Sequence, residues 1–211
     1  MIRIALAATA LALSFPAASQ EATEMPGVAD PTRVTAGTYA ADPAHTLVGW
    51  EVSHFGFNPY FGSLGDVEGT LTIDPADLES AKVDVSLPIT SLSLVSADLR
   101  EHLLRPGKDG GDPDFFGPEP GEARFVSTRV VQRSDTQAYI YGDLTMNGAT
   151  NPIAIAATFS GAGTNPMNQA ETIGFTGVAV IKRSEYGVSA FIPVISDEVK
   201  LTISAAFEKQ E

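Results

Sequence analysis

The sequence of 211 residues contains no cysteine, so neither a disulfide framework nor thiolate-bound metal can stabilise this protein. Basic residues are also few, because 13 lysines and arginines stand against 26 aspartates and glutamates, a formal net charge of −13. Nucleic-acid binding needs a clustered basic surface, so we expect no nucleic-acid partner. Stability must come from an ordinary apolar core, and the excess of acidic residues mainly serves solubility.

Motifs of the common catalytic and metal sites are missing as well. The chain has no G-x-S-x-G nucleophile elbow, no H-E-x-x-H pair and no glycine-rich phosphate loop. Of its three histidines, His45 and His54 are too far apart along an extended segment to bind one metal ion together. The acidic residues within 109–122 do not follow the spacing of a calcium loop. We therefore predict that the protein is not an enzyme and has no catalytic residue, metal or cofactor.

The longest apolar run is at the N-terminus, where Arg3 precedes apolar residues 4–15 and small residues follow at 17–19. This pattern is typical of a secretory signal peptide. The run is shorter than the roughly 20 residues that span a bilayer. We therefore predict a signal peptide at 1–19 with cleavage near Ser19, export to the periplasm and no stable membrane insertion. A flexible linker at 20–36 and one domain at 37–211 should follow.

The clearest structural signal is a β-hairpin centred on Asn147-Gly148. Apolar residues alternate with polar ones before this pair, from Ala138 to Met146, and again after it, from Ile153 to Phe159. Asn-Gly suits a tight hairpin turn because both residues tolerate positive φ. Alternation with a period of two predicts strands that each have one apolar and one polar face.

The same alternation recurs along the chain and predicts eight or nine strands. The further segments are 38–41, 48–54, 67–73, 83–87, 125–131, 173–181 and 199–207. Such a series, with turn residues between its members, indicates an antiparallel sandwich or barrel. Small residues on the apolar faces either leave an open lumen or relieve crowding at barrel corners. They are Gly69, Gly142, Ala157, Gly177, Ala179 and Ala205.

Two segments depart from this pattern. Leu99, Leu103 and Leu104 have helical spacing behind Ser96, a suitable N-cap, so a short helix is expected there. Residues 105–121 are rich in Gly, Pro and Asp and should form a long loop. Long loops in compact domains often carry function.

Several short motifs follow one another in a recognisable order. They lie at 42–46 (DPAHT), 48–56 (VGWEVSHFG), 62–64 (GSL), 69–74 (GTLTID), 102–103 (HL), 114–116 (DFF), 125–128 (FVST) and 142–152 (GDLTMNGATNP). In this order they resemble the YceI-like family of polyisoprenoid-binding proteins, over residues 38–207. The resemblance implies an all-β, elongated, antiparallel eight-stranded lipocalin-like β-barrel with one short helix. It also implies an apolar lumen that holds a polyprenyl lipid or the tail of an isoprenoid quinone. Residues 106–113 resemble an insertion relative to the family.

In each predicted strand, the apolar residues that alternate with polar ones should face the lumen, and they are the candidate ligand-binding residues. They are Val48, Trp50, Val52, His54, Leu71, Ile140, Gly142, Leu144, Ile155, Ala157, Phe159 and Phe175. Trp50 serves equally as core or as ligand lining, since both occupy the same face of a barrel. His54 is either a solvated histidine at a strand end or a polar contact near the mouth. The aromatic residues of 55–61 either plug a barrel end or gate an entrance.

These features predict an exported lipid-binding protein that holds an isoprenoid chain as a carrier or reservoir. Each CH₂ group that the lumen hides from water contributes about 0.8 kcal/mol. The alternative is a non-catalytic stress-related or interaction module whose barrel is filled by its own side chains. No feature of the sequence indicates an oligomeric state.

Overall fold

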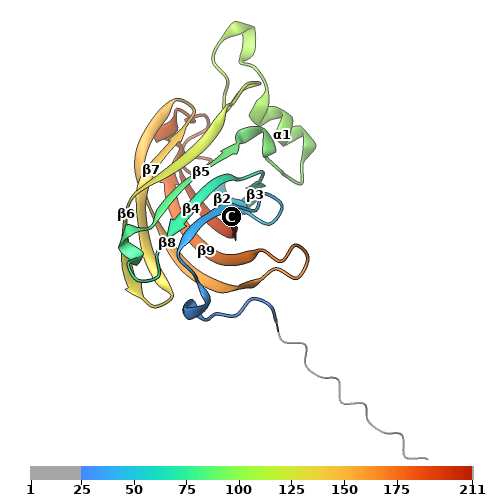
Figure 1. Cartoon of the computed structure of the whole chain (residues 1–211). Coiled ribbons are helices and arrows are strands. Elements are labelled where there is room, and N and C mark those ends of the chain that lie inside the picture. Colours follow the sequence, from blue (N-terminus) through green and yellow to red (C-terminus); the bar gives the residue numbers. More distant parts are fainter. Residues whose placement is uncertain (1–24, 211) are drawn as a thin grey trace, which may run out of the picture.

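A computed structural model describes residues 25–210; the predicted signal peptide lies outside the described residues. One antiparallel sheet contains ten strands in the order β1-β4-β5-β6-β7-β8-β9-β10-β2-β3 (Figure 1). The strands are β1 (Gly37–Ala41), β2 (Leu47–His54), β3 (Asn58–Leu64), β4 (Glu68–Ile73), β5 (Lys82–Pro88), β6 (Glu122–Ser134), β7 (Gln137–Met146), β8 (Ala149–Thr164), β9 (Glu171–Lys182) and β10 (Glu198–Lys209). Short 3₁₀ helices are η1 (Pro31–Arg33), η2 (Leu78–Ser80), η3 (Ile89–Ser91), η4 (Lys108–Gly110) and η5 (Arg183–Tyr186).

The sheet closes into a barrel where β1 meets β10, with Tyr39 opposite Lys209 and Ala41 opposite Phe207. The circuit consists of β1 and β4 to β10, which confirms the predicted eight-stranded antiparallel barrel. The first half of β10 pairs instead with β2, where Leu201 lies opposite Trp50. Strands β2 and β3 therefore form a hairpin that leaves the closed circuit while staying attached to β10.

The outer edge of this hairpin is only briefly paired. Ser63 of β3 exchanges two backbone hydrogen bonds with Ser93, at 3.1 and 2.8 Å, and forms an isolated bridge. Strand β3 thus has no second strand neighbour in the sheet, and its bridge partner Ser93 belongs to residues 89–104, which also include helix α1 (Ala97–Leu104). Tyr60 and Phe61, read from sequence as part of a plug or gate, belong to β3.

Local sequence signals account for the hairpin and the helix. Asn147 and Gly148 have φ of 51° and 78°, and they form the two-residue turn between β7 and β8. The Ser96 hydroxyl accepts a hydrogen bond from the Leu99 amide at 3.2 Å, which caps α1 as predicted. Among residues 25–210, no helix is long and apolar enough to cross a membrane.

The described part of the linker predicted at 20–36, residues 25–36, makes specific contacts with the barrel. Val28 pairs with Ala162 of β8 through two backbone hydrogen bonds, and Asp30 caps η1. The approach is so close that a Cβ on Gly163 would collide with the Pro26 carbonyl oxygen. The pattern of β8 allows this docking because glycines face the incoming segment. Figure 1 places η1 at one end of the barrel and α1 near the other.

Candidate ligand-binding site

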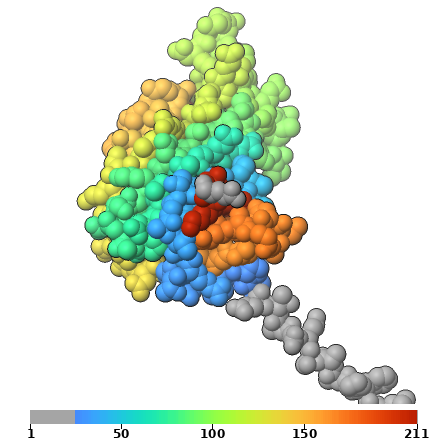
Figure 2. Space-filling model, viewed as in Figure 1, coloured from blue at the N-terminus to red at the C-terminus, as the bar shows by residue number. Residues whose placement is uncertain are grey.

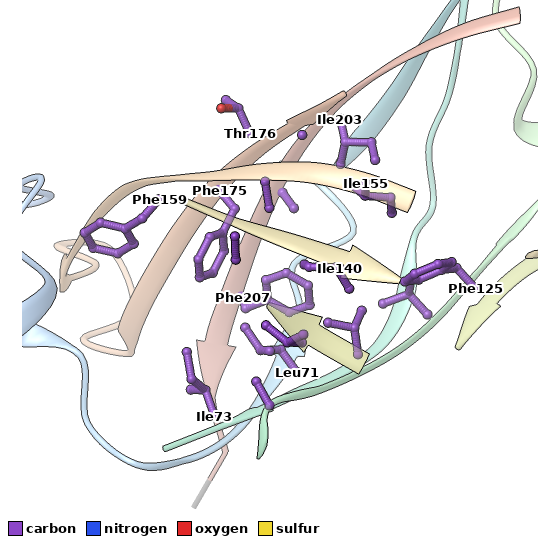
Figure 3. Close-up of a pocket in the computed structure, with 18 of the residues that line it drawn as sticks. Leu71, Ile73, Phe125, Ile140, Ile155, Phe159, Phe175, Thr176, Ile203 and Phe207 are labelled. Atoms are coloured by element: carbon purple, nitrogen blue, oxygen red, sulfur yellow. The ribbon is translucent and has the colours of Figure 1, made fainter. Parts of the chain in front are cut away.

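The barrel encloses a cavity of about 600 Å³, here called the barrel chamber. Pockets that hold small molecules and cofactors span roughly 300–1,000 Å³. Apolar side chains on the inner faces of β4 to β10 form most of its wall (Figure 3). Phe159 packs edge-on against Phe175 at 5.8 Å between ring centres, and Phe175 packs against Phe207 at 6.4 Å. Figure 3 shows Phe159 and Phe175 toward one end of the chamber and Phe125 toward the other.

A second cavity of about 330 Å³, here called the helix-side chamber, lies between the β2–β3 hairpin and helix α1. Its walls come from the β2–β3 hairpin, α1, the 105–121 loop and residues 188–195. Four side chains line both chambers: Leu64, Met146, Ile181 and Leu201. The two chambers are therefore adjacent. An apolar chain too long for the barrel chamber could extend into the helix-side chamber.

The predicted lumen residues divide between the two chambers. The barrel chamber is lined by Val48, Leu71, Ile140, Leu144, Ile155, Ala157, Phe159 and Phe175. The helix-side chamber is lined by Trp50, Val52 and His54. This division follows the departure of β2 from the barrel circuit, because only the first inward residue of β2 still faces the barrel.

Gly142 lines neither chamber, contrary to the prediction. A Cβ at this position would lie 2.5 Å from Cζ of Phe125, whose ring fills the space beside the glycine. The other small residues divide in the same way. Ala157, Gly177 and Ala205 border the barrel chamber, whereas a Cβ on Gly69 would collide with the β5 backbone. Small residues thus both open the lumen and relieve crowding.

Sequence reasoning missed most of the helix-side wall. The missed residues include Leu99, His102, Leu103, Phe115, Phe116, Val188 and Phe191. They lie outside regular strands, so no alternation marks them. The available signal was the Phe-Phe pair within an otherwise polar loop. Figure 2 shows that this loop projects from the molecule next to α1.

A polar cluster ties the 105–121 loop to α1 beside the helix-side chamber. The Arg105 guanidinium donates to Asp114 Oδ2 at 3.0 Å and lies 3.0 Å from His102 Nε2. Hydrogen bonds from Arg105 and then His102 hold the pKa of Asp114 below its usual value. The His102 ring also meets Phe115 and Phe191 edge-on, at 5.4 and 6.1 Å between centres. This cluster therefore positions the aromatic wall of the chamber.

A buried arginine holds the adjoining 188–196 part of the wall. Arg183 is 6% exposed and donates to the carbonyl oxygens of Val188, Ile195 and Ser196, each at 2.9 Å. Burial lowers the pKa of Arg183, while the charge of Asp197 acts in the opposite direction. Three bonds from one guanidinium fix the 188–196 segment as a rigid boundary of the helix-side chamber.

The fold and its cavities define a lipocalin-like β-barrel with an internal apolar binding space. A family model described as the YceI-like domain matches residues 39–207, and the chain belongs to the YceI-like family. A relative named UPF0312 protein, from Ectopseudomonas mendocina, is 32% identical over 172 residues, covering 80% of this chain and 86% of the relative.

Solved structures agree on the fold. The BcnA structure of Burkholderia cenocepacia matches with a TM-score of 0.66 and 20% identity, covering 79% of this chain and 98% of that one. A structure described as a polyisoprenoid binding domain from Saccharophagus degradans matches with a TM-score of 0.53 and 11% identity, covering 83% and 100%. At these identities the likeness concerns the architecture of the barrel.

Proposed function

We propose that this protein binds an isoprenoid chain in its two chambers and acts as an exported, non-catalytic carrier or reservoir for that lipid. The observation that carries the proposal is the barrel chamber, a cavity of about 600 Å³ with an almost wholly apolar wall. An apolar space of this size gains its binding free energy from hiding hydrocarbon, at about 0.8 kcal/mol per CH₂ group. The shape of the barrel rather than polar contacts then selects a long, slender ligand.

Membership of the YceI-like family and the solved polyisoprenoid binding domain of the same fold support an isoprenoid as the ligand. The leader-like N-terminus supports export, and the periplasm is the proposed location. The alternative of a barrel filled by its own side chains does not fit, because the described side chains leave this volume open. A prenyl lipid and an isoprenoid quinone satisfy the cavity equally well, since both present the same branched hydrocarbon chain.

The test is lipid extraction of the purified protein followed by mass spectrometry, with two alanine variants. Ala157 lines the barrel chamber, so Ala157→Leu should fill open space and reduce the recovered isoprenoid while leaving thermal stability nearly unchanged. Ala154 lies on the exposed face of the same strand, so Ala154→Leu should retain the lipid. Absence of any isoprenoid from the parent protein, together with a loss of about 1–3 kcal/mol in Ala157→Leu, contradicts the proposal because it indicates a solid core.

A further inference from the structure

Five large apolar side chains stand in solvent near the helix-side chamber. Phe57 is 88% exposed, and the exposed fractions of the other four lie between 36% and 52%. Together they are here called the apolar rim: Phe55, Phe57, Phe191, Ile192 and Val194. Single exposed apolar residues are ordinary, whereas a contiguous group marks an interaction surface.

Backbone hydrogen bonds hold the two parts of the rim together. The Phe55 amide donates to the Val194 carbonyl at 2.7 Å, and the Ser196 amide donates to the Ser53 carbonyl at 3.0 Å. His54 and Ile195 form an isolated bridge between these contacts. The β2–β3 turn and the 188–196 segment therefore form one surface, although more than a hundred residues separate them in the sequence.

The rim is also the mouth of the cavity. Phe55 and Phe191 are about half exposed and line the helix-side chamber at the same time. Their φ angles are 54° and 62°, in the left-handed region that bulky residues rarely adopt. Large apolar side chains thus occupy positions at which glycine would be unstrained. Apolar side chains of the chamber lining thus reach the outer surface at Phe55 and Phe191.

The charge pattern changes at this surface. The chain carries 26 acidic residues, yet residues 52–65 and 186–196 contain no Asp, Glu, Lys or Arg. Both rim segments lie within these two stretches. A protein of net charge −13 is repelled by an anionic bilayer, while an uncharged apolar rim can enter the interface of a neutral one. Aromatic side chains favour that interfacial region.

We propose that the apolar rim docks reversibly on the surface of a zwitterionic phospholipid bilayer, with the mouth of the helix-side chamber facing the lipid. The inference rests on the proposed function, since an isoprenoid ligand resides in a bilayer before the protein binds it. Docking in this orientation lets the hydrocarbon chain pass from bilayer to cavity beneath Phe55 and Phe191 without crossing water. The rim does not span the membrane, because only a turn and a loop contribute to it.

The test is flotation with phosphatidylcholine vesicles, using protein expressed from the full chain. Phe57→Ser and Val194→Ser should each weaken vesicle binding about tenfold or more. Neither Phe57 nor Val194 lines a chamber, so both variants should retain extractable isoprenoid. Met167→Ser is the matched control: Met167 is 90% exposed but lies in the β8–β9 turn, at the other end of β9 from the rim. All variants share one N-terminus, so the leader cannot explain a difference.

Several outcomes overturn the inference. They are failure of the parent protein to bind neutral vesicles, and equal weakening by Met167→Ser. A parent protein that is dimeric in sedimentation, becomes monomeric in Phe57→Ser and ignores vesicles would assign the rim to a second copy instead. Rim-dependent vesicle binding without recoverable isoprenoid would leave docking intact and contradict the proposed function alone.

Addition of anionic phosphatidylglycerol to the vesicles should weaken binding of the protein at low salt, and added salt should restore this binding.

Discussion

Trp50 of β2 and Gly62 of β3 lie opposite each other, and the indole ring covers the glycine. A Cβ on Gly62 would meet this ring and also lie 2.6 Å from Cδ2 of Leu94. The glycine thereby lets the only tryptophan of the chain lie flat between the hairpin and the segment that precedes α1. The indole thus becomes part of the wall of the helix-side chamber.

Trp50 fluorescence should therefore report the contents of this chamber. Stripping bound lipid should change the emission, and adding a prenyl lipid should restore it, because the indole loses and regains an apolar neighbour. Gly62→Ala should displace the ring, shift the resting spectrum and cost about 1–3 kcal/mol in unfolding free energy. Emission that stays constant while lipid is removed would contradict a ligand next to Trp50.

Two glycines of the barrel, Gly142 of β7 and Gly177 of β9, should respond differently to alanine. In Gly142→Ala the new methyl group would lie 2.5 Å from both Phe125 Cζ and the Val126 carbonyl oxygen. We expect a loss of about 1–3 kcal/mol in unfolding free energy. In Gly177→Ala the nearest atom is Ile155 Cγ2 at 3.0 Å, at the edge of open space, so the loss should be smaller. Chemical denaturation of both variants measures the difference, and equal losses would contradict it.

Tyr186 is fully buried, and its hydroxyl has no hydrogen-bond partner among the described residues. Burial, with the nearby charge of Glu185, raises the pKa of Tyr186 to about 12. Tyr186→Phe removes an unsatisfied polar group, so stability should stay constant or rise by about 1 kcal/mol.

Tyr39→Phe is the matched control for that change. The Tyr39 hydroxyl lies 2.6 Å from Glu171 Oε1 and 2.8 Å from the Thr35 carbonyl oxygen. Removing this hydroxyl should cost about 1–3 kcal/mol, measured by thermal or chemical unfolding. A clear loss in Tyr186→Phe, comparable with that in Tyr39→Phe, would indicate a partner for the Tyr186 hydroxyl.

Glu171 should make part of the stability acid-sensitive. Burial alone would raise its pKa, but hydrogen bonds from Tyr39, Thr35 and Lys209 outweigh burial and keep the pKa below the ordinary value of 4.5. A lowered pKa in the folded state means that this contribution is complete above pH 4.5 and is lost as the pH falls through the folded-state pKa. Glu171→Gln should cost about 1–3 kcal/mol at pH 7 and flatten the stability profile below pH 4.5. If this variant loses stability below pH 4.5 as steeply as the parent protein does, other carboxylates cause the acid sensitivity.

The predicted leader is tested by N-terminal sequencing of protein from the periplasmic fraction. The pattern around Ala17 and Ser19 predicts a mature protein that starts near Gln20. Recovery of folded protein that still begins at Met1 would contradict cleavage.

The strands other than β3, the β7–β8 turn and α1 were predictable because each depends on neighbouring residues; β3 was not predicted from the sequence. Alternation separates the inner from the outer face of any strand, so the inward positions of β7 and β8 were predictable, although inward-facing Gly142 does not border the chamber. The Asn147-Gly148 turn and the Ser96 cap are equally local, since each is made by residues within a few positions of one another. Closure into a barrel followed from the number of one-sided strands together with the family resemblance.

Other features depend on which distant segments meet, and only the folded chain decides them. Trp50 and His54 alternate with Val48 in the sequence, yet they face a different chamber because β2 leaves the barrel circuit. The space beside Gly142 is closed by Phe125 from the neighbouring strand β6, which no pattern within β7 reveals. At the mouth of the helix-side chamber, backbone hydrogen bonds join residues 53–55 to residues 194–196, which are far apart in the sequence. The period of a strand thus specifies which side chains point inward, whereas whether they meet a cavity, a ring or another backbone depends on the packing of elements remote in sequence.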